Sequence, residues 1–330
     1  MKPVVSVITP TYNHEGFIAD CIESVLRQTR REWEMIIIDD GSSDDTAKIV
    51  RRYNDPRITY IRKEHRGIEY LGENYNHALE MSKGEYILIL EGDDFIPPRR
   101  IEMQLPAFEE EKVVLSHGKY AYVWNGRSLV YSTPFKKDLL DNQPLGSAFK
   151  LFLQGFNPIG TQSVMIRKSA LLDVGGFEQP SYLPLVDYPT WMKLALKGHF
   201  EFIPEVLGFW RRHPLSITIN KNSQIFLGFM KYCDEFIISF DEELAKLGLT
   251  KFIKNRGAIA YLSLSWINLS NKNWEEALKL AQKSWNRHEV LCWLFKIKIL
   301  IAIISAYLHL DIPSYFKKMM QRLNQREVLQ

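Results

Sequence analysis

The 330-residue sequence contains little cysteine, and the few cysteines it has are far apart. They are Cys21, Cys233 and Cys292, an odd number without the paired spacing of a zinc site or a redox couple. Proteins that depend on disulfides in oxidising compartments are usually richer in cysteine. The scarcity therefore predicts a reducing, cytoplasmic location.

We expect no export signal in the sequence, and a glycine-rich phosphate loop is missing from it. Its first residues, MKPVVSVITPTYN, enter an expected strand almost at once, which leaves no room for a charged region, an apolar stretch and a cleavage site. Neither GxGxxG nor GxxxxGK[ST] occurs at an expected strand-to-helix turn. We therefore expect neither a Rossmann dehydrogenase nor a P-loop nucleotidase, and we expect bound phosphate to be held by metal and side chains.

Charge of one sign is not in excess. The chain has 42 basic and 39 acidic residues, a formal net charge of +3, so no overall field attracts nucleic acid and we expect no nucleic-acid partner. A composition of 46% hydrophobic and 25% charged residues is typical of a folded chain. The length allows one large domain with an appendage, or two domains.

Short apolar segments alternate with amphipathic segments in the first part of the chain. Strands are expected at residues 4–9, 35–38, 58–61 and 86–90, and helices after Phe17, after Ser43 or Asp44, and from Tyr70 to Met81. This alternation predicts an α/β fold in which a mostly parallel sheet is flanked by helices on both faces. Ligands of such sheets bind beyond the carboxyl ends of the strands.

An acidic cluster follows the last of these strands and comprises Glu91, Asp93 and Asp94. Adjacent carboxylates repel one another and lose hydration when partly enclosed, so a cation or a hydrogen-bond network usually balances them. Magnesium and manganese favour carboxylate oxygens and often share them with substrate phosphates. A solvated turn is the alternative, and the cluster alone leaves the two interpretations evenly matched.

Two further loops are expected at the same edge of the sheet. The loop from Pro10 to Asn13 carries Tyr12, whose ring offers a face for a nucleotide base. The loop from Asp39 to Ser43 carries Asp40, an acceptor for a base or ribose donor. Singly, each is more often an ordinary half-buried tyrosine or a capping aspartate, but their joint position beside the acidic cluster favours a nucleotide site.

These segments resemble, in order and spacing, the inverting glycosyltransferases of family 2, which have the GT-A nucleotide-sugar fold. The resemblance covers about the first two thirds of the chain and is carried by SVITPTYN, IIIDDGSSDDT, NHALEMSKGEYILILEGDD, GGF at Gly175 to Phe177, VDYPTWMKLALKG and RRHPLS. It implies transfer of a hexose or N-acetylhexosamine from a nucleotide-diphosphate donor, most commonly a UDP-sugar. The implied acceptor is a glycan or lipid-linked glycan of a cell-surface polymer or glycoconjugate, and the implied cofactor is divalent manganese or magnesium.

The resemblance also implies roles for single residues. Asp187 matches the catalytic base, and Asp93 and His213 match the metal site. The positions matched to donor binding are Pro10, Tyr12, Asn13, Asp40, Asn76, Glu91, Asp94 and Arg212. From the residues alone, Asp187 before an apolar helix is also typical of a helix cap. In the same way, the basic residues before His213 are more often a solvated edge than a phosphate clamp.

Two residues depart from the pattern of the family. Glu91 stands where aspartate is common and keeps the charge, whereas Val186 stands where a glutamate commonly precedes the base. The alternative is therefore a catalytically reduced nucleotide-sugar-binding or scaffold module, which release of nucleoside diphosphate from a donor would discriminate. Trp191 and Trp210 are candidates for a sugar pocket, with core packing as the more common role of a tryptophan.

We expect a transferase domain over residues 1–220, with a nucleotide-sugar half at about 1–115 and an acceptor half at about 116–220, and a helical region over 221–330. In the acceptor half, Asn125-Gly126 is typical of a hairpin turn.

The most apolar stretch of the chain runs from Val290 to Leu310 and is near the length of a membrane span. Lys296 and Lys298 are expected on different faces of this helix, which favours a buried or surface-lying helix. The basic segment FKKMMQRLNQR follows it and suits an anionic membrane surface or a solvated closing helix about equally. Peripheral association with the inner face of the cytoplasmic membrane is therefore an expectation for this region.

Overall fold

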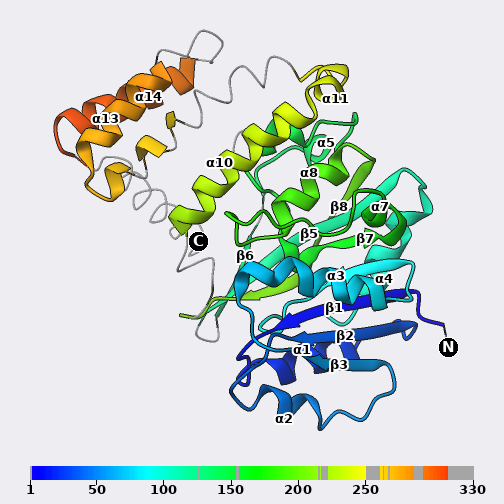
Figure 1. The fold of residues 1–330 in the computed structure, drawn as a ribbon. Coiled ribbons are helices and arrows are strands. Elements are labelled where there is room, and N and C mark those ends of the chain that lie inside the picture. The colour runs from blue at the N-terminus through cyan, green and yellow to red at the C-terminus, as the bar shows by residue number, and fades with distance from the viewer. Residues whose placement is uncertain are drawn as a thin grey trace, which may run out of the picture. The chain divides into compact units, whose positions relative to one another are not determined.

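The chain forms two compact units in the computed structural model (Figure 1). The first unit is Met1–Phe152 with Phe156–Tyr232, and the second is Leu153–Gly155 with Cys233–Gln330. The structure describes residues 2–124, 127–131, 133–153, 156–214, 216, 222–249, 261–262, 264–266, 268–285 and 293–310. The central sheet belongs to the first unit.

Parallel strands build one half of the sheet, in the order β3-β2-β1-β4. They are β1 (Val5–Thr11), β2 (Trp33–Asp39), β3 (Ile58–Arg62) and β4 (Tyr86–Ile89). The helices between them are α1 (Ile18–Leu26), α2 (Thr46–Val50) and α3 (Leu71–Met81), the last entered through a 3-10 turn at Ile68–Tyr70. The predicted alternation of strands and helices is thus confirmed.

Strand β1 continues past the residue where the sequence predicted its end. Pro10 pairs with Ile38 of β2, whereas the pairing of β1 with β4 stops at Ile8 and Ile89. The carbonyl of Pro10 accepts a hydrogen bond from the amide of Gly92, on the side where β4 has already ended. The missing N–H of proline therefore costs no ladder hydrogen bond, and the strand carries Thr11 and Tyr12 to the edge of the sheet.

Both faces of the parallel strands are buried, which explains their near-continuous apolar sequences. Ile18, Cys21 and Ile22 of α1 pack with Val7 and Met35 on one face. Helix α3 covers the other face of β1 and β2 and buries Tyr75, Ala78 and Leu79 (Figure 1). The loops at the carboxyl ends of these strands therefore begin from strands that are packed on both faces.

The other half of the sheet is mixed. β7 (Met165–Arg167) runs antiparallel to β4, β5 (Val113–Trp124) runs antiparallel to β7 and to β6 (Arg127–Tyr131), and β8 (His199–Arg211) runs parallel to β5. Short helices connect these strands: α4 (Arg100–Gln104), α5 (Lys137–Leu140), α6 (Phe149–Phe152), α7 (Lys168–Asp173) and α8 (Asp187–Ala195), with 3-10 turns at Leu105–Glu109 and Thr161–Ser163. The predicted turn at residues 125–126 lies outside the described residues, although β5 and β6 on either side of it pair as a hairpin.

The C-terminal region is helical, as predicted. Helix α10 (Asn222–Ser239) begins in the first unit and ends in the second, which also holds α11 (Asp241–Lys246), α13 (Trp274–Trp285) and α14 (Trp293–Tyr307). Small residues such as Ala277, Ala281 and Ala302 allow α13 and α14 to pack closely. Among the helices described, none has the combined length and apolarity needed to cross a membrane. The basic segment 316–326 lies outside the described residues.

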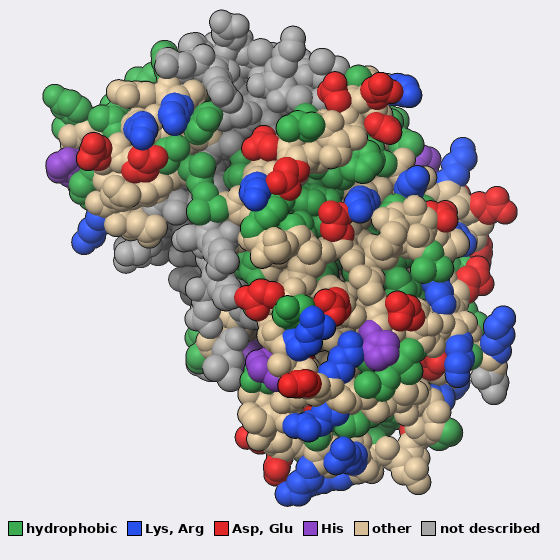
Figure 2. Space-filling model, viewed as in Figure 1, with side chains coloured by type: hydrophobic (Ala, Val, Ile, Leu, Met, Phe, Trp, Pro, Cys, Tyr) green, Lys and Arg blue, Asp and Glu red, His purple; other side chains and the backbone are tan. Residues whose placement is uncertain are grey.

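On the face of the molecule that Figure 2 shows, basic and acidic side chains are interspersed. This distribution agrees with the nearly balanced charge of the sequence. Selectivity for an anionic ligand would therefore depend on a few residues at one site.

Candidate active site

A cavity of about 590 Å³ lies at the carboxyl ends of the parallel strands. Its size is within the range of small-molecule sites. Loops from distant parts of the chain line it, and these residues are Pro10, Thr11, Tyr12, Asn13, His14, Asp40, His65, Gly67, Ile68, Glu69, Leu71, Asn74, Glu91, Asp93, Pro184, Leu185, Trp210, His213 and Ser216. The loops after β1, β2 and β4 thus meet at this cavity, as the sequence predicted.

An aromatic pair forms part of the lining. The rings of Tyr12 and His65 are stacked with centroids 4.1 Å apart and planes 12° apart, and 38% of Tyr12 remains exposed. The turn that carries His65 approaches very close to Gly41, where a Cβ atom would lie 2.6 Å from the His65 amide nitrogen. Gly41 also has φ +74°, so glycine is needed there both for space and for conformation.

Asp40 fastens this turn to the end of β2. Its carboxylate accepts hydrogen bonds from the backbone amides of Arg66 (3.3 Å) and Gly67 (3.0 Å) and from Nδ2 of Asn74 (3.4 Å). Nδ1 of His65 lies 2.8 Å from Oδ2 of Asp40. Asp40 is thus an acceptor at the wall of the cavity, next to the stacked rings.

The neighbouring Asp39 has a different role. Its Oδ1 accepts hydrogen bonds from the amide (2.7 Å) and hydroxyl (2.6 Å) of Ser42 and so closes the loop after β2. Asn13 connects this loop to the one after β1, because its Oδ1 accepts a hydrogen bond from the amide of Ser43 (2.8 Å). Of the two aspartates, Asp39 is therefore the one with the loop-closing role and Asp40 the one that lines the cavity.

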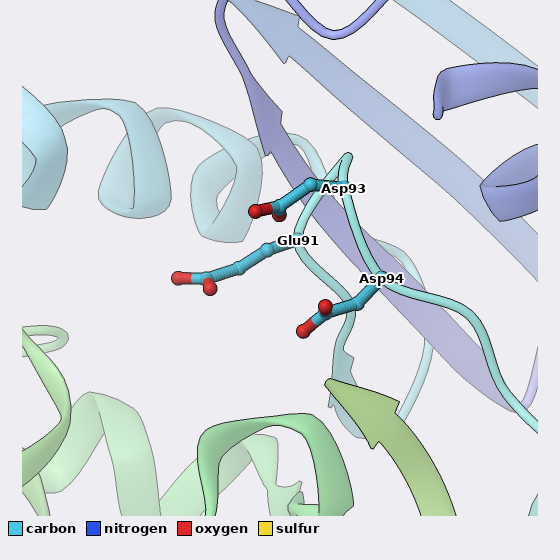
Figure 3. Close-up of side chains that lie close together, drawn as sticks. All are labelled: Glu91, Asp93 and Asp94. Atoms are coloured by element: carbon cyan, nitrogen blue, oxygen red, sulfur yellow. The ribbon is translucent and has the colours of Figure 1, made fainter. Parts of the chain in front are cut away.

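The acidic cluster follows β4, and its three carboxylates point to the same side of the loop (Figure 3). One oxygen from each of Glu91, Asp93 and Asp94 lies within 4.8 Å of the others. Glu91 accepts a hydrogen bond from the hydroxyl of Tyr75 (3.1 Å), and Asp94 accepts one from the backbone amide of Arg211 (2.9 Å). Both of these carboxylates are thus tied to neighbouring elements.

His213 joins the third carboxylate of the cluster. Its Nε2 lies 3.0 Å from Oδ2 of Asp93, and both residues line the cavity. The structure therefore brings the two predicted metal-binding residues together, although they are 120 positions apart in the chain.

The carboxylates of the cluster differ in their protonation. Burial and the charge of Asp93 raise the pKa of Glu91 to about 8. Burial and the charges of Asp93 and Glu91 raise the pKa of Asp94 well above its usual value. Burial opposes ionisation of Asp93 too, but the hydrogen bond from His213 and the charge of His14 outweigh it and lower its pKa. Asp93 is thus the member that carries the negative charge.

The residues at this point fit a divalent cation. Carboxylate oxygens and a neutral imidazole nitrogen are suitable ligands for manganese, and carboxylates for magnesium. Oδ2 of Asp93 and Nε2 of His213 lie 3.0 Å apart, so one ion would be within reach of both atoms. Burial first, and then the charge of Asp93, raise the pKa of Glu91, and a bound cation would favour its charged form. Asp94 is less suited, since it already binds the amide of Arg211.

The predicted base, Asp187, lies at the start of α8, as expected. Its Oδ2 accepts hydrogen bonds from Nδ2 of Asn157 (3.0 Å) and from the hydroxyl of Thr161 (3.2 Å). Its Oδ1 is buried and has no hydrogen-bond partner among the residues that the structure describes. Burial raises the pKa of Asp187, and its charge in turn helps to raise the pKa of Glu91. Asp187 is not part of the cavity lining, but it is close enough to act on the acidic cluster.

Of the residues predicted to bind the donor, Asn76, Asp94 and Arg212 do not line this cavity. Both ends of the Asn76 amide bind the backbone of Phe177, at 2.8 Å each, and so hold the turn at Gly176, where φ is +82°. The Arg212 guanidinium lies over the rings of Tyr122 and Trp210. In the structure the Asn76 amide thus holds this turn, and its contact with the donor stays a prediction.

The sequence analysis missed several lining residues, among them His14, His65 and Asn74. Nδ1 of His14 lies 3.1 Å from the hydroxyl of Thr11, and burial lowers the pKa of His14. Asn74, two positions before Asn76, is the asparagine of α3 that faces the cavity. Trp210 lines the cavity, whereas Trp191 is fully buried and belongs to the core.

The raised pKa of Glu91 predicts how stability depends on pH without metal. The pKa of Glu91 rises from 4.5 to about 8 on folding, so this carboxyl binds its proton more tightly in the folded chain. Its contribution to the free energy of unfolding is therefore fully present below about pH 4.5 and is lost as the pH rises through about 8. We therefore expect Glu91→Gln to raise the Tm in EDTA at pH 9 and to change it little at pH 5. Thermal melts across this range test the prediction, with the exposed Glu64→Gln as control. A Tm difference that does not vary with pH would contradict it.

Comparison with known proteins adds independent information on this chain. Residues 6–171 match the family model described as glycosyl transferase family 2. A Bacillus subtilis protein named for teichuronic acid biosynthesis, TuaG, is 33% identical over 229 residues, which are 67% of this chain and 83% of TuaG. The chondroitin synthase of Escherichia coli is 29% identical over 257 residues, 76% of this chain but 34% of that protein.

Solved structures share the fold. S. aureus TarS 1-349 in complex with UDP-GlcNAc has a TM-score of 0.56 at 18% identity, over 96% of this chain and 92% of that one. The mannosyltransferase PcManGT from Pyrobaculum calidifontis, in complex with GDP-Man and Mn²⁺, has a TM-score of 0.55 at 18% identity, over 94% and 88% of the two chains.

Proposed function

Because this chain belongs to glycosyl transferase family 2, we propose that it uses the cavity to transfer a sugar from a nucleoside diphosphate to a glycan or lipid-linked glycan. The proposed donor is a UDP-linked hexose or N-acetylhexosamine, and the proposed reaction inverts the anomeric carbon. TarS, which has been solved with UDP-GlcNAc, supports the choice of donor. TuaG and chondroitin synthase, whose names refer to polymers, support a polysaccharide acceptor.

The strongest support for the proposal is the set of groups that line the cavity together. A stacking ring, a fixed carboxylate acceptor and a charged carboxylate beside an imidazole line a single cavity at the carboxyl ends of parallel strands. These groups suit the successive parts of a nucleotide sugar, namely base, ribose and diphosphate. A simple acidic turn would not require the stacked Tyr12 and His65 in the lining of the same cavity.

In this proposal the base of the donor stacks on the exposed face of Tyr12, and Asp40 accepts a hydrogen bond from the base or the ribose. Pro10 and Asn13 shape the loop beneath it. Asp93 and His213 would hold manganese or magnesium, with Glu91 beside them. When bound, the ion would supply positive charge against the charge that develops on the departing diphosphate. The structure of PcManGT with GDP-Man and Mn²⁺ supports this choice of metal.

The transfer itself needs one base, for which we propose Asp187. The acceptor oxygen forms the new bond to the anomeric carbon while the bond from that carbon to the diphosphate oxygen breaks, and the diphosphate leaves with the electron pair. The acceptor hydroxyl gives its proton to Oδ1 of Asp187, the oxygen for which the described part of the chain offers no hydrogen-bond donor. Asn157 and Thr161 donate to Oδ2 and so fix the orientation of the carboxylate.

For the chain as a whole, we propose that residues 1–220 act as the transferase domain. In this scheme residues 1–115 bind the donor and residues 116–220 bind the acceptor. The helical region 221–330 would serve peripheral association with the inner face of the cytoplasmic membrane. The cytoplasmic location stays a prediction from the scattered cysteines, of which Cys21 and Cys233 are buried.

Slow hydrolysis of the donor tests this function without knowledge of the acceptor. We expect the full chain with MnCl₂ to release UDP from at least one of a panel of UDP-hexoses and UDP-N-acetylhexosamines, because water can replace the acceptor hydroxyl. UDP release is measured by a coupled luminescent assay, and UDP binding by thermal shift. Binding of UDP without release from any donor would favour the catalytically reduced module, and neither binding nor release would contradict the proposed function.

A further inference from the structure

One face of the ribbon formed by β5, β6 and β8 is aromatic. In the strand register Tyr122 lies opposite Trp210 of β8, and Tyr120 lies opposite Tyr131 of β6. Since side chains alternate between the faces of a sheet, these residues share one face. The centroids of the Tyr120 and Tyr131 rings are 5.0 Å apart, and those of Tyr122 and Trp210 are 5.2 Å apart. We call these four rings together with Arg212 the aromatic wall.

The opposite face of β8 is engaged in packing. Phe209 stacks on Phe95 with ring centroids 4.6 Å apart, and Arg211 donates hydrogen bonds to the carbonyl of Asp93 (3.1 Å) and to the carboxylate of Asp20. The face of the aromatic wall, by contrast, continues into exposed apolar side chains, with Leu129 65% and Trp124 49% exposed. The wall is thus not explained by the packing of the core.

The guanidinium of Arg212 lies over two rings of the wall. Its guanidinium carbon lies 5.3 Å from the ring centroid of Tyr122 and 5.7 Å from that of Trp210. The residue is exposed, and within the described part of the chain no carboxylate forms an ion pair with it. A guanidinium that rests on aromatic rings keeps its N–H donors at the edge, where they can bind a carboxylate or phosphate with two hydrogen bonds.

The wall connects the cavity to Asp187. Trp210 lines the cavity at one side of the wall. At the other side, Gly160 lies against Tyr120 so closely that a Cβ would be 2.6 Å from the ring. Gly160 belongs to the turn whose Asn157 and Thr161 orient Asp187. A molecule resting on the wall would therefore reach from the donor cavity toward the proposed base.

We propose that the aromatic wall binds the acceptor and that this acceptor is an anionic glycan. The inference rests on the proposed function. The C–H face of a sugar ring would stack on Tyr122 and Trp210, because an aromatic face is apolar while its surroundings remain accessible to hydroxyl groups. Arg212 would bind a carboxylate or phosphate of the same or the next unit. This assigns Arg212 to the acceptor instead of the donor.

Direct binding measurements test the proposal in the absence of donor. The probes are a hexasaccharide of alternating uronic acid and N-acetylhexosamine, the same hexasaccharide with its carboxylates reduced to alcohols, and a polyol-phosphate oligomer of similar length. Binding to the full chain is followed by calorimetry and tryptophan fluorescence at low salt. We expect at least one anionic probe to bind at least tenfold more tightly than the reduced probe, and the anion that binds identifies carboxylate or phosphate as the group recognised.

Variants separate the stacking rings from the charge. Arg212→Gln should remove the tenfold preference and leave binding of the reduced probe unchanged, whereas Tyr122→Leu should weaken all probes. Arg52→Gln removes an exposed arginine after α2 and serves as the control. It should change neither the preference for the anionic probe nor the affinity for any probe. Thermal shift with UDP in each variant reports on the donor site separately.

Several results would overturn the proposal. One is equal binding of the anionic and reduced probes, and another is an unchanged preference in Arg212→Gln. A loss of UDP binding in Arg212→Gln would return Arg212 to the donor site. By contrast, failure of the wild-type chain to bind UDP would contradict the proposed function, irrespective of the glycan results.

Discussion

Asp187→Asn is expected to slow sugar transfer strongly while the fold and nucleotide binding are retained. The amide keeps an oxygen for the hydrogen bonds from Asn157 and Thr161. It cannot, however, take the proton of the acceptor hydroxyl at neutral pH. A positioned general base contributes about 10²- to 10⁴-fold to a rate, so we expect kcat for transfer to fall within this range. Initial rates with a radiolabelled donor measure it.

The stability of the same variant separates catalysis from folding. Burial raises the pKa of Asp187, which means that the folded chain disfavours its charged form. A neutral asparagine should therefore leave the Tm unchanged or raise it slightly. Asp173→Asn, which alters an exposed aspartate of α7, is the matched control and should affect neither rate nor Tm. Near-normal turnover of Asp187→Asn would remove this residue from the reaction, and a lowered Tm would indicate a structural role instead.

The parallel half of the fold could be predicted because each of its strands is a continuous apolar segment followed by an amphipathic helix. The mixed half could not, since its pairing depends on contacts between distant segments. Arg99 and Arg100 illustrate the difference, because they are neighbours in the sequence but one is exposed and the other fully buried. Arg100 donates to the carbonyls of Gln162 (2.6 Å) and Val164 (2.8 Å), more than 60 positions away. Nothing local in the sequence distinguishes the two.

In the candidate site, too, the residues that directly follow apolar strands could be predicted, and the others could not. Asp40 and Asp93 follow apolar strands, and the edge of a parallel sheet brings such residues together. Asn74 and Asn76 were not distinguishable, because they lie about 200° apart around the axis of α3 and the sequence does not say which direction faces the cavity. His65 lies in a segment without periodicity and reaches the cavity only through the close approach at Gly41.

Asp93→Asn is expected to remove the metal-dependent part of nucleotide binding. Asparagine keeps the size of the side chain and a hydrogen bond to His213, but not the negative charge that the lowered pKa of Asp93 maintains. Loss of an outer partner of a metal ligand costs about 10- to 100-fold in metal affinity, so loss of a direct ligand should cost at least about 100-fold in affinity for Mn²⁺. Calorimetry with MnCl₂ and UDP measures this loss.

The decisive comparison combines the variant with a chelator. If Asp93 acts through the ion, EDTA should lower UDP affinity and donor hydrolysis in the wild-type chain but have no further effect on Asp93→Asn, since both changes remove the same interaction. Asp45→Asn, which alters an exposed aspartate that forms an ion pair with Lys48, should respond to EDTA as the wild type does. Full hydrolysis by the wild type in EDTA would exclude the metal from this site. Equal additional losses in the wild type and Asp93→Asn would place the metal elsewhere, and Asp93 would then act through its charge alone.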